Sequence, residues 1–280
     1  MMNAINIAGD FIGVSLLHAG VPGVAVPTLI SRAIAAVLLT TLAFRPGNQV
    51  QLRWGGILAW NRADIGRILR IAAPGGVENG LFALGKVLVT SVVSQFGTVQ
   101  IAANGVSNSI NQIAIIVASA VNLAMITVVG RCMGAREYEQ AEYYTKKLMK
   151  ISYISTAILG SIVCLSLPLI LRFCRLEPET LRLAAVLIIM HNLLAAVLHP
   201  TSFNLANSLR AAGDVRYTVY VGAFSMVAFR LGSARLSGVV LGWGVTGVWI
   251  AMGMDWLARF TCFVHRYYQK SWQSCRVITS

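Results

Sequence analysis

The sequence predicts an all-α protein that crosses a membrane several times. Of its 280 residues, 56% are hydrophobic and only 12% are charged, whereas a soluble domain usually carries about 25% charged residues. The apolar residues form long runs that are separated by short basic stretches. This pattern excludes a soluble globular enzyme, a disordered chain, a collagen and a coiled coil.

Eight apolar segments are long enough to cross the hydrocarbon core, which takes about 20 residues of helix. Within lipid a spanning segment must satisfy its own backbone hydrogen bonds, and these runs are too long and too continuously apolar for barrel strands. We therefore expect a helical bundle. The predicted spans are residues 2–18, 24–44, 71–95, 105–130, 148–171, 181–204, 215–235 and 240–263.

The net charge of +13 comes from 23 Lys and Arg against 10 Asp and Glu. These basic residues lie between apolar runs and form no continuous patch, so we expect no nucleic-acid partner. Most of them follow the even-numbered spans, and basic loops mark the cytoplasmic side. The chain is thus predicted to be a multi-pass protein of the cell membrane with a cytoplasmic C-terminus. The five cysteines lack metal-ligand spacing, which favours reduced thiols.

The longest polar stretch, residues 45–70, is the predicted domain boundary. It looks like an amphipathic linker, with apolar residues such as Ile57, Leu58 and Ile65. It separates two spans in residues 1–44 from six spans in residues 71–263, and a tail over 264–280 ends the chain.

A carboxylate in the first span suggests a cation or proton site. A charge inside a span is costly and is a functional hypothesis by default. Asp10 follows Asn6 by four residues, so both lie on one helix face, and Thr28 in the second span adds a hydroxyl oxygen. Such oxygens can bind Na⁺ or hold a titratable proton. The alternative is that Asp10 lies near a helix end and meets water.

The third span contains a second carboxylate, Glu78, just after Pro74-Gly75-Gly76. Proline and glycine free backbone carbonyls to line a cavity. We expect Glu78 to alternate between a proton and a cationic substrate. The alternative is a structural ion pair with another helix.

Amides form a stripe on the fourth span, at Asn104, Asn108, Asn111 and Gln112. They are either interhelical hydrogen-bonding groups or the wall of a substrate cavity. Gln95, at the end of the preceding span, slightly favours the cavity.

Two further groups lie in the last spans. His199 titrates near neutral pH and suits proton coupling, although a lone histidine is more often structural. Asp255 and Arg259 are four residues apart, which favours an intrahelical ion pair. No P-loop, dinucleotide fingerprint, zinc-protease motif or hydrolase elbow is present in the sequence, so we expect a protein that is not an enzyme.

Five sequence segments, taken together and in this order, resemble those of a known protein family. They are PGGVENGLFALGK (74–86), IAANGVSNSI (101–110), VVGRCMGAREYEQAEYYTKK (128–147), LRAAGDVRYT (209–218) and GVWIAMGMDWLARF (247–260). With them the chain resembles the MATE family of multidrug and toxic compound extrusion transporters. That family has twelve helices in two six-helix lobes, and this chain resembles the last eight. We therefore expect an N-terminally truncated member, with two N-lobe helices in 1–44, the interlobe linker in 45–70 and a six-helix C-lobe in 71–263.

The resemblance implies an antiporter that exports organic cations and drugs by alternating access, driven by Na⁺ or H⁺. Asn6, Asp10 and Thr28 match the N-lobe cation site of the family, where Na⁺ is the only metal expected, and Glu78 matches its C-lobe carboxylate. His199 falls near an acidic position of the tenth family helix. No other cofactor is implied, and the oligomeric state stays open. Two alternatives remain: a flippase-like exporter of a lipid-linked sugar, and a truncated chain that is inactive alone.

Overall fold

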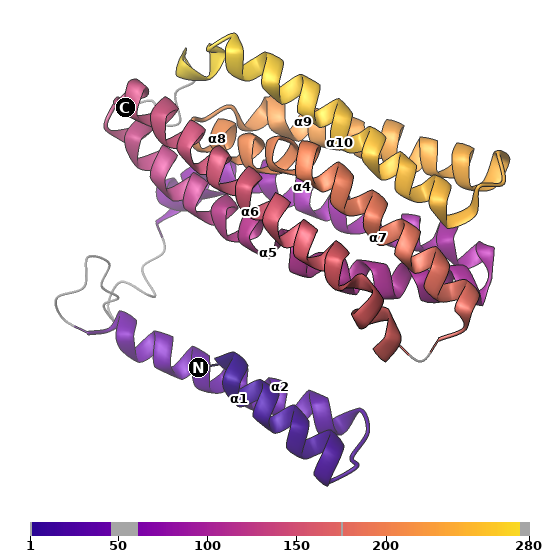
Figure 1. The fold of residues 1–280 in the computed structure, drawn as a ribbon. Helices are drawn as coiled ribbons and strands as arrows, with labels where there is room; N and C mark the ends of the chain where they lie inside the picture. The colour runs from indigo at the N-terminus through magenta and orange to yellow at the C-terminus, as the bar shows by residue number, and fades with distance from the viewer. Residues whose placement is uncertain (1, 46–60, 175, 275–280) are drawn as a thin grey trace. The chain divides into compact units, whose positions relative to one another are not determined.

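The computed structural model describes residues 2–45, 61–174 and 176–274. Within α4 the side chains at 63, 64, 67, 68, 70–72, 74 and 78 lie outside this description. The described residues form helices and turns, and none of them lies in a strand. The chain divides into two compact units, Met1–Gly66 and Arg67–Ser280 (Figure 1). The division falls inside the segment 45–70 that the sequence marks as a linker.

The first unit is built from two packed helices. Helix α1 (Met2–Phe11) continues into a wide turn (Ile12–Leu16), and α2 (Pro22–Ala43) begins with a proline, whose missing N–H costs nothing at the start of a helix. Glycines bring the two helices together, because a Cβ atom on Gly23 would lie 2.7 Å from the carbonyl oxygen of Gly13. Such close approach is how small residues stabilise helix pairs in lipid.

The second unit consists of long helices that run side by side and of shorter helices between them (Figure 1). They are α4 (Arg62–Val93), α5 (Thr98–Gly134), α6 (Tyr138–Phe173), α7 (Pro178–His199), α8 (Ala206–Ala211), α9 (Val215–Ser225) and α10 (Gly244–Tyr268). Helix α5 packs against α6, α7 and α8, and α10 packs against α7 and α9.

A wide helical turn, Pro200–Leu205, joins α7 to α8. Pro200 has no N–H to donate to the preceding turn, and helices commonly widen at such a break. The turn is buried, and it places Ser202 and Phe203 at the wall of a cavity described below.

The interior is packed with small, aliphatic and aromatic side chains, and many further large aliphatic side chains lie on the outside. Trp249 and Trp256 of α10 are buried against alanines and leucines of α7. By contrast, Leu123, Leu165 and Leu193 are 71%, 82% and 67% exposed. An apolar outer surface of this extent is typical of a protein whose solvent is lipid.

The structure confirms the predicted all-α membrane class and changes several boundaries. Five of the described helices are long and apolar enough to cross a membrane. The predicted span 215–235 contains only 11 residues of regular helix in α9, and wide turns follow it (Met226–Gly232 and Arg235–Val240). Residues 62–70 of the predicted linker are already helical, and so are 264–268 of the predicted tail. Ile57 and Leu58 lie outside the described residues.

Candidate coupling and binding sites

The first unit brings together the three residues that the sequence marks as a cation site. The Asn6 side-chain amide of α1 donates to Thr28 Oγ1 of α2 at 3.0 Å and to Asp10 Oδ1 at 3.4 Å. Thr28 in turn donates to the carbonyl oxygen of Val24 at 2.8 Å. All three side chains are half-buried. The cluster depends on the glycine contact that holds α1 against α2.

This cluster offers a carboxylate, an amide and a hydroxyl at one point between two apolar helices. In the described rotamer the amide nitrogen of Asn6 faces the carboxylate of Asp10. Rotating the amide by half a turn would present its oxygen to the same point, and amide oxygen and nitrogen are nearly the same size. Carboxylate, amide and hydroxyl oxygens together are a ligand set that suits a hard cation, and the carboxylate alone suits a proton.

The second unit contains a polar cavity of about 330 Å³ between α4, α5, the Pro200–Leu205 turn, α8 and α10. Basic and amide side chains dominate its polar lining, and none of the described lining residues carries a carboxylate; the side chain of Glu78, next to Asn79, is not among those described. The lining residues are Asn79, Phe82, Ala83, Lys86, Asn122, Ser202, Phe203, Ala206, Asn207, Arg210 and Arg259.

A chain of hydrogen bonds holds the amide side of this cavity. Asn207 donates to Asn122 Oδ1 at 2.8 Å, which ties α8 to α5. Arg210 donates to Asn207 Oδ1 at 2.9 Å and, through Nε, to Thr218 Oγ1 at 3.2 Å. The guanidinium of Arg210 is therefore held beside the cavity by partners on α8 and α9.

On the other side of the cavity lies a buried cluster of charges. Asp255 is completely buried and accepts from Arg259 Nε at 2.8 Å, while Arg230 lies 3.7 Å away on its other side. Arg259 also donates to the carbonyl oxygen of Gly222 at 2.9 Å, and its guanidinium lies 4.3 Å from the centre of the Phe82 ring. One carboxylate thus faces two guanidiniums, so the cluster has an excess positive charge.

Helix α4 supplies one wall of the cavity. Asn79, Phe82, Ala83 and Lys86 line it at helical spacing. Glu78 precedes the first of them within α4, but its side chain lies outside the described residues. Its predicted role in coupling stays a prediction.

His199 is buried behind the cavity and is not one of its lining residues. Its ring lies 4.7 Å from that of Phe203 and 5.3 Å from that of Trp256, measured between centroids. Its Nδ1 has no partner among the described residues. The ring of Phe203 contacts both His199 and the cavity, and a role of His199 in proton transfer stays a prediction.

The predicted amide stripe mostly joins helices. Asn104 accepts from Trp249 Nε1 at 2.9 Å, and Asn111 accepts from Asn192 Nδ2 at 3.1 Å. Asn108 donates to its own helix at Asn104 O, 2.9 Å away, and Gln112 and Gln95 are exposed. None of the five lines the polar cavity.

Sequence reasoning missed three of the polar residues at this cavity: Asn122, Asn207 and Arg210. A signal for Asn122 was present, since it follows Asn111 by 11 residues, which is about three helical turns and nearly the same face. Nothing in the sequence indicates that α8 would fold back against α5 and bring Asn207 to Asn122.

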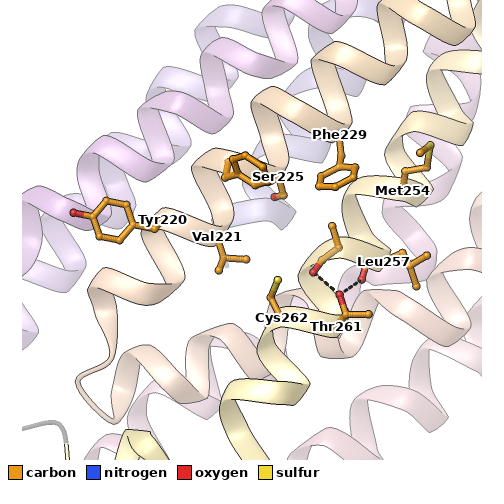
Figure 2. A pocket seen from close by; sticks show the side chains of 10 residues that line it. Tyr220, Val221, Ser225, Phe229, Met254, Leu257, Thr261 and Cys262 are labelled. Atoms are coloured by element: carbon orange, nitrogen blue, oxygen red, sulfur yellow. Dashed lines mark hydrogen bonds between the residues drawn. The ribbon is translucent and has the colours of Figure 1, made fainter.

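A second pocket, of about 650 Å³, lies between α9 and α10 and is almost wholly apolar. Figure 2 shows Tyr220, Phe229 and Met254 around it, and the hydroxyl of Thr261 donates to its own helix at Leu257 and Ala258. No charged side chain lines it. Among the described residues the pocket thus lacks the carboxylate and amide groups of the cluster at Asn6 and Asp10.

The chain is similar to one protein family and to several transporters. The model of the MatE family matches residues 74–231, more than half of the chain. Among curated proteins, the chain is 28% identical over 281 residues to an uncharacterized transporter, YisQ, of Bacillus subtilis, covering 97% of this chain and 60% of that protein. It is 24% identical over 261 residues to the probable multidrug resistance protein NorM of Thermotoga maritima, covering 93% and 55%.

Solved structures show the same fold. An outward-facing multidrug resistance MATE family transporter of the MOP superfamily matches with a TM-score of 0.84 at 18% identity, covering 98% of this chain and 61% of that one. A MOP superfamily transporter from Pyrococcus furiosus matches with a TM-score of 0.85 at 19% identity, covering 98% and 62%. The chain thus spans about 60% of the length of these relatives. By its sequence match and its helical architecture, this multi-pass membrane protein belongs to the MatE family of transporters.

Proposed function

We propose that the chain forms part of an antiporter that exports organic cations and drugs in exchange for Na⁺ or H⁺. The observation that carries this proposal is the meeting of Asn6, Asp10 and Thr28 at one point between α1 and α2. Similarity to probable multidrug resistance proteins, among them NorM of Thermotoga maritima, supports the substrate class.

In this mechanism Asp10 binds the coupling ion while the protein faces one side and releases it on the other. A bare carboxylate among apolar helices is costly, so the site favours being occupied by a cation or a proton. Exchange requires that the ion and the substrate each prefer a different conformation, because a ligand without differential affinity shifts nothing. Glu78 is proposed to bind and release a cation or proton in the same way in the second unit. The C-terminus of the chain is proposed to lie in the cytoplasm.

Efflux of a fluorescent organic cation from cells that express the chain tests this function. Asp10→Asn and Glu78→Gln are each expected to abolish efflux, because both remove the titratable charge and keep the shape. Glu179→Gln is the matched control, since Glu179 is an exposed carboxylate in the first turn of α7. Equal efflux by all four proteins would contradict the proposal.

Reconstituted vesicles separate the two coupling ions. An imposed Na⁺ gradient and an imposed pH gradient are compared for the wild type and for Thr28→Val, which removes a hydroxyl ligand and keeps the shape. If Na⁺ is bound, Thr28→Val weakens the Na⁺-driven exchange. If only a proton is exchanged, this variant retains its activity, because the carboxylate of Asp10 is enough.

The basic cavity of the second unit favours a second candidate function, the export of an anionic compound such as a lipid-linked sugar. Lys86, Arg210 and Arg259 all line that cavity. The description of the Pyrococcus furiosus transporter says that the reverse polarity of its binding pocket suggests a different function. An anionic substrate would complement such a pocket electrostatically.

Lys86 distinguishes the two substrate classes. For an anionic substrate, Lys86→Gln weakens transport and Lys86→Arg preserves it. For an organic cation, Lys86→Gln leaves export intact or increases it, because a repelling charge has been removed. A chain that reaches the membrane but transports neither class supports the remaining alternative, that these residues are inactive alone.

A further inference from the structure

A groove of about 450 Å³ runs between α6 and α10, away from the cavity described above. The polarity of its lining changes along the groove. Lys146 and Lys150 of α6 line one part, while Met149, Ile154 and Val264 supply apolar side chains. A groove with both a basic and an apolar part matches an amphipathic ligand.

The basic part of the groove lies toward the ends of the two helices. Helix α6 begins at Tyr138 and α10 ends at Tyr268. An ion pair of 3.9 Å between Lys270 and Glu142 shows that these two ends are neighbours. Lys146 therefore lies near a membrane surface, and Ile154, two turns further along α6, lies deeper. The order from basic residues at the surface to apolar residues further in matches a phospholipid, whose head group lies at the surface and whose acyl chains point inward.

We propose that this groove binds an anionic phospholipid, with its phosphate at Lys146 and Lys150 and an acyl chain along Met149, Ile154 and Val264. Basic pockets between membrane helices are a recognised means of binding anionic head groups. A zwitterionic lipid would fill the same space but would gain less from the two lysines.

The neighbouring charges support a preference for an anion. The carboxylate of Glu142 lies 2.6 Å from the groove residue Lys146 and 3.9 Å from Lys270. It is thus shared by two lysines. Lys150 has no ion-pair partner in the part of the chain that the structure describes. The rim therefore keeps a positive charge that a head-group phosphate would neutralise.

Tyr267 provides an independent observation. It lines the groove, and its ring stacks on that of Trp272 with 5.8 Å between centroids. Its hydroxyl is buried and has no hydrogen-bond partner among the described residues. A buried hydroxyl without a partner is unfavourable, so a rotation of the Tyr267 side chain that let its hydroxyl donate to a head-group oxygen would be favoured.

Native mass spectrometry of the purified 280-residue chain tests this inference, with phosphatidylglycerol and phosphatidylcholine added in turn. The wild type is expected to retain one phosphatidylglycerol in preference to phosphatidylcholine. Lys146→Gln with Lys150→Gln should weaken that binding by roughly 25-fold, because each surface lysine contributes roughly fivefold. Lys147→Gln is the matched control, since Lys147 lies on the same helix over the Tyr143 ring and does not line the groove.

Three results would overturn the proposal. The first is equal retention of the two lipids by the wild type. The second is an equal loss in the control variant and in the double variant, which would indicate a general effect of surface charge. The third is full competition by glycerol phosphate, which has no acyl chain and would reveal a simple phosphate site. Size-exclusion profiles that match the wild type show that the variants are folded.

Discussion

Asp255 is the residue on which the buried charge cluster depends. It faces Arg259 at 2.8 Å and Arg230 at 3.7 Å, and it is completely buried. A buried pair is not a strong source of stability in itself, but removing one partner leaves an uncompensated charge. The two guanidiniums share a single carboxylate, so the cost of a substitution depends on which side of the cluster is changed.

We expect Asp255→Asn to destabilise the protein by about 3–5 kcal/mol, because two buried guanidiniums lose their counter-charge. Arg259→Gln should cost less, since Asp255 keeps Arg230 as its partner. Thermal unfolding of the purified variants in detergent measures both. Finding that Arg259→Gln is the more damaging change would show that its contacts with Gly222 and Phe82 outweigh the charge balance.

At the scale of helices, the pairing of α1 with α2 depends on glycine. A Cβ atom on Gly23 would meet the Gly13 carbonyl oxygen at 2.7 Å. The cluster of Asn6, Asp10 and Thr28 spans the same pair of helices, and its hydrogen bond of 3.0 Å leaves little room for separation.

Gly23→Leu is expected to force α1 from α2, at a cost of about 1–3 kcal/mol for overpacking, and to abolish ion-coupled efflux. Gly20→Ala is the comparison at a nearby glycine with no atom within 4 Å of an added Cβ, although its φ of +60° adds some strain. Efflux assays and surface expression are measured together. Normal efflux in Gly23→Leu would show that the cluster of Asn6, Asp10 and Thr28 is not needed for ion coupling.

The amide side chains of α5 test two alternative roles: hydrogen bonding between helices, and lining of a substrate cavity. Asn111 accepts from Asn192 of α7 and is buried, whereas Asn108 is exposed and bonds only its own helix. Hydrogen bonds between membrane helices contribute about 0.6 kcal/mol on average and up to about 1.7 kcal/mol.

Asn111→Ala should therefore lower the unfolding free energy by about 0.6–1.7 kcal/mol, and Asn108→Ala should leave it unchanged. Thermal unfolding measures this difference, and the KM for efflux is followed in parallel. An altered KM in Asn111→Ala with unchanged stability would assign that residue to a substrate cavity instead.

On the scale of the whole molecule, the second unit has a self-contained interior. Within the described residues, the three buried apolar clusters draw their members from Val89 onward. The two units, Met1–Gly66 and Arg67–Ser280, are each compact.

Residues 67–280 expressed alone are therefore expected to remain folded and to give a single size-exclusion peak in detergent. They should show no efflux, because Asn6, Asp10 and Thr28 are then missing. An aggregated product would show that the second unit needs the first for its stability. Efflux that persists would place the coupling site wholly within α4 to α10.

Periodicity and composition were enough to predict the membrane class and most helices, because a run of about 20 apolar residues is typical of a membrane-spanning helix. They were also enough for Asn6 and Asp10, whose spacing of four residues puts them on one helix face. The residues alone offered Thr28 as a further hydroxyl oxygen on the next span, and only the resemblance implied that it lies beside Asn6. Periodicity failed over 215–240, where the helix widens in turns that apolar patterning does not distinguish from regular helix.

The sequence by itself determined that the chain spans a membrane, that it resembles one transporter family and that a few polar residues lie inside the spans. Only the tertiary structure decided what each polar residue contacts. Asn104 and Asn111 join helices, while Asn122, Asn207 and Arg210 meet at a basic cavity. The physical reason is that a helix fixes only which residues share a face. Which neighbour that face meets depends on packing between segments far apart in the chain.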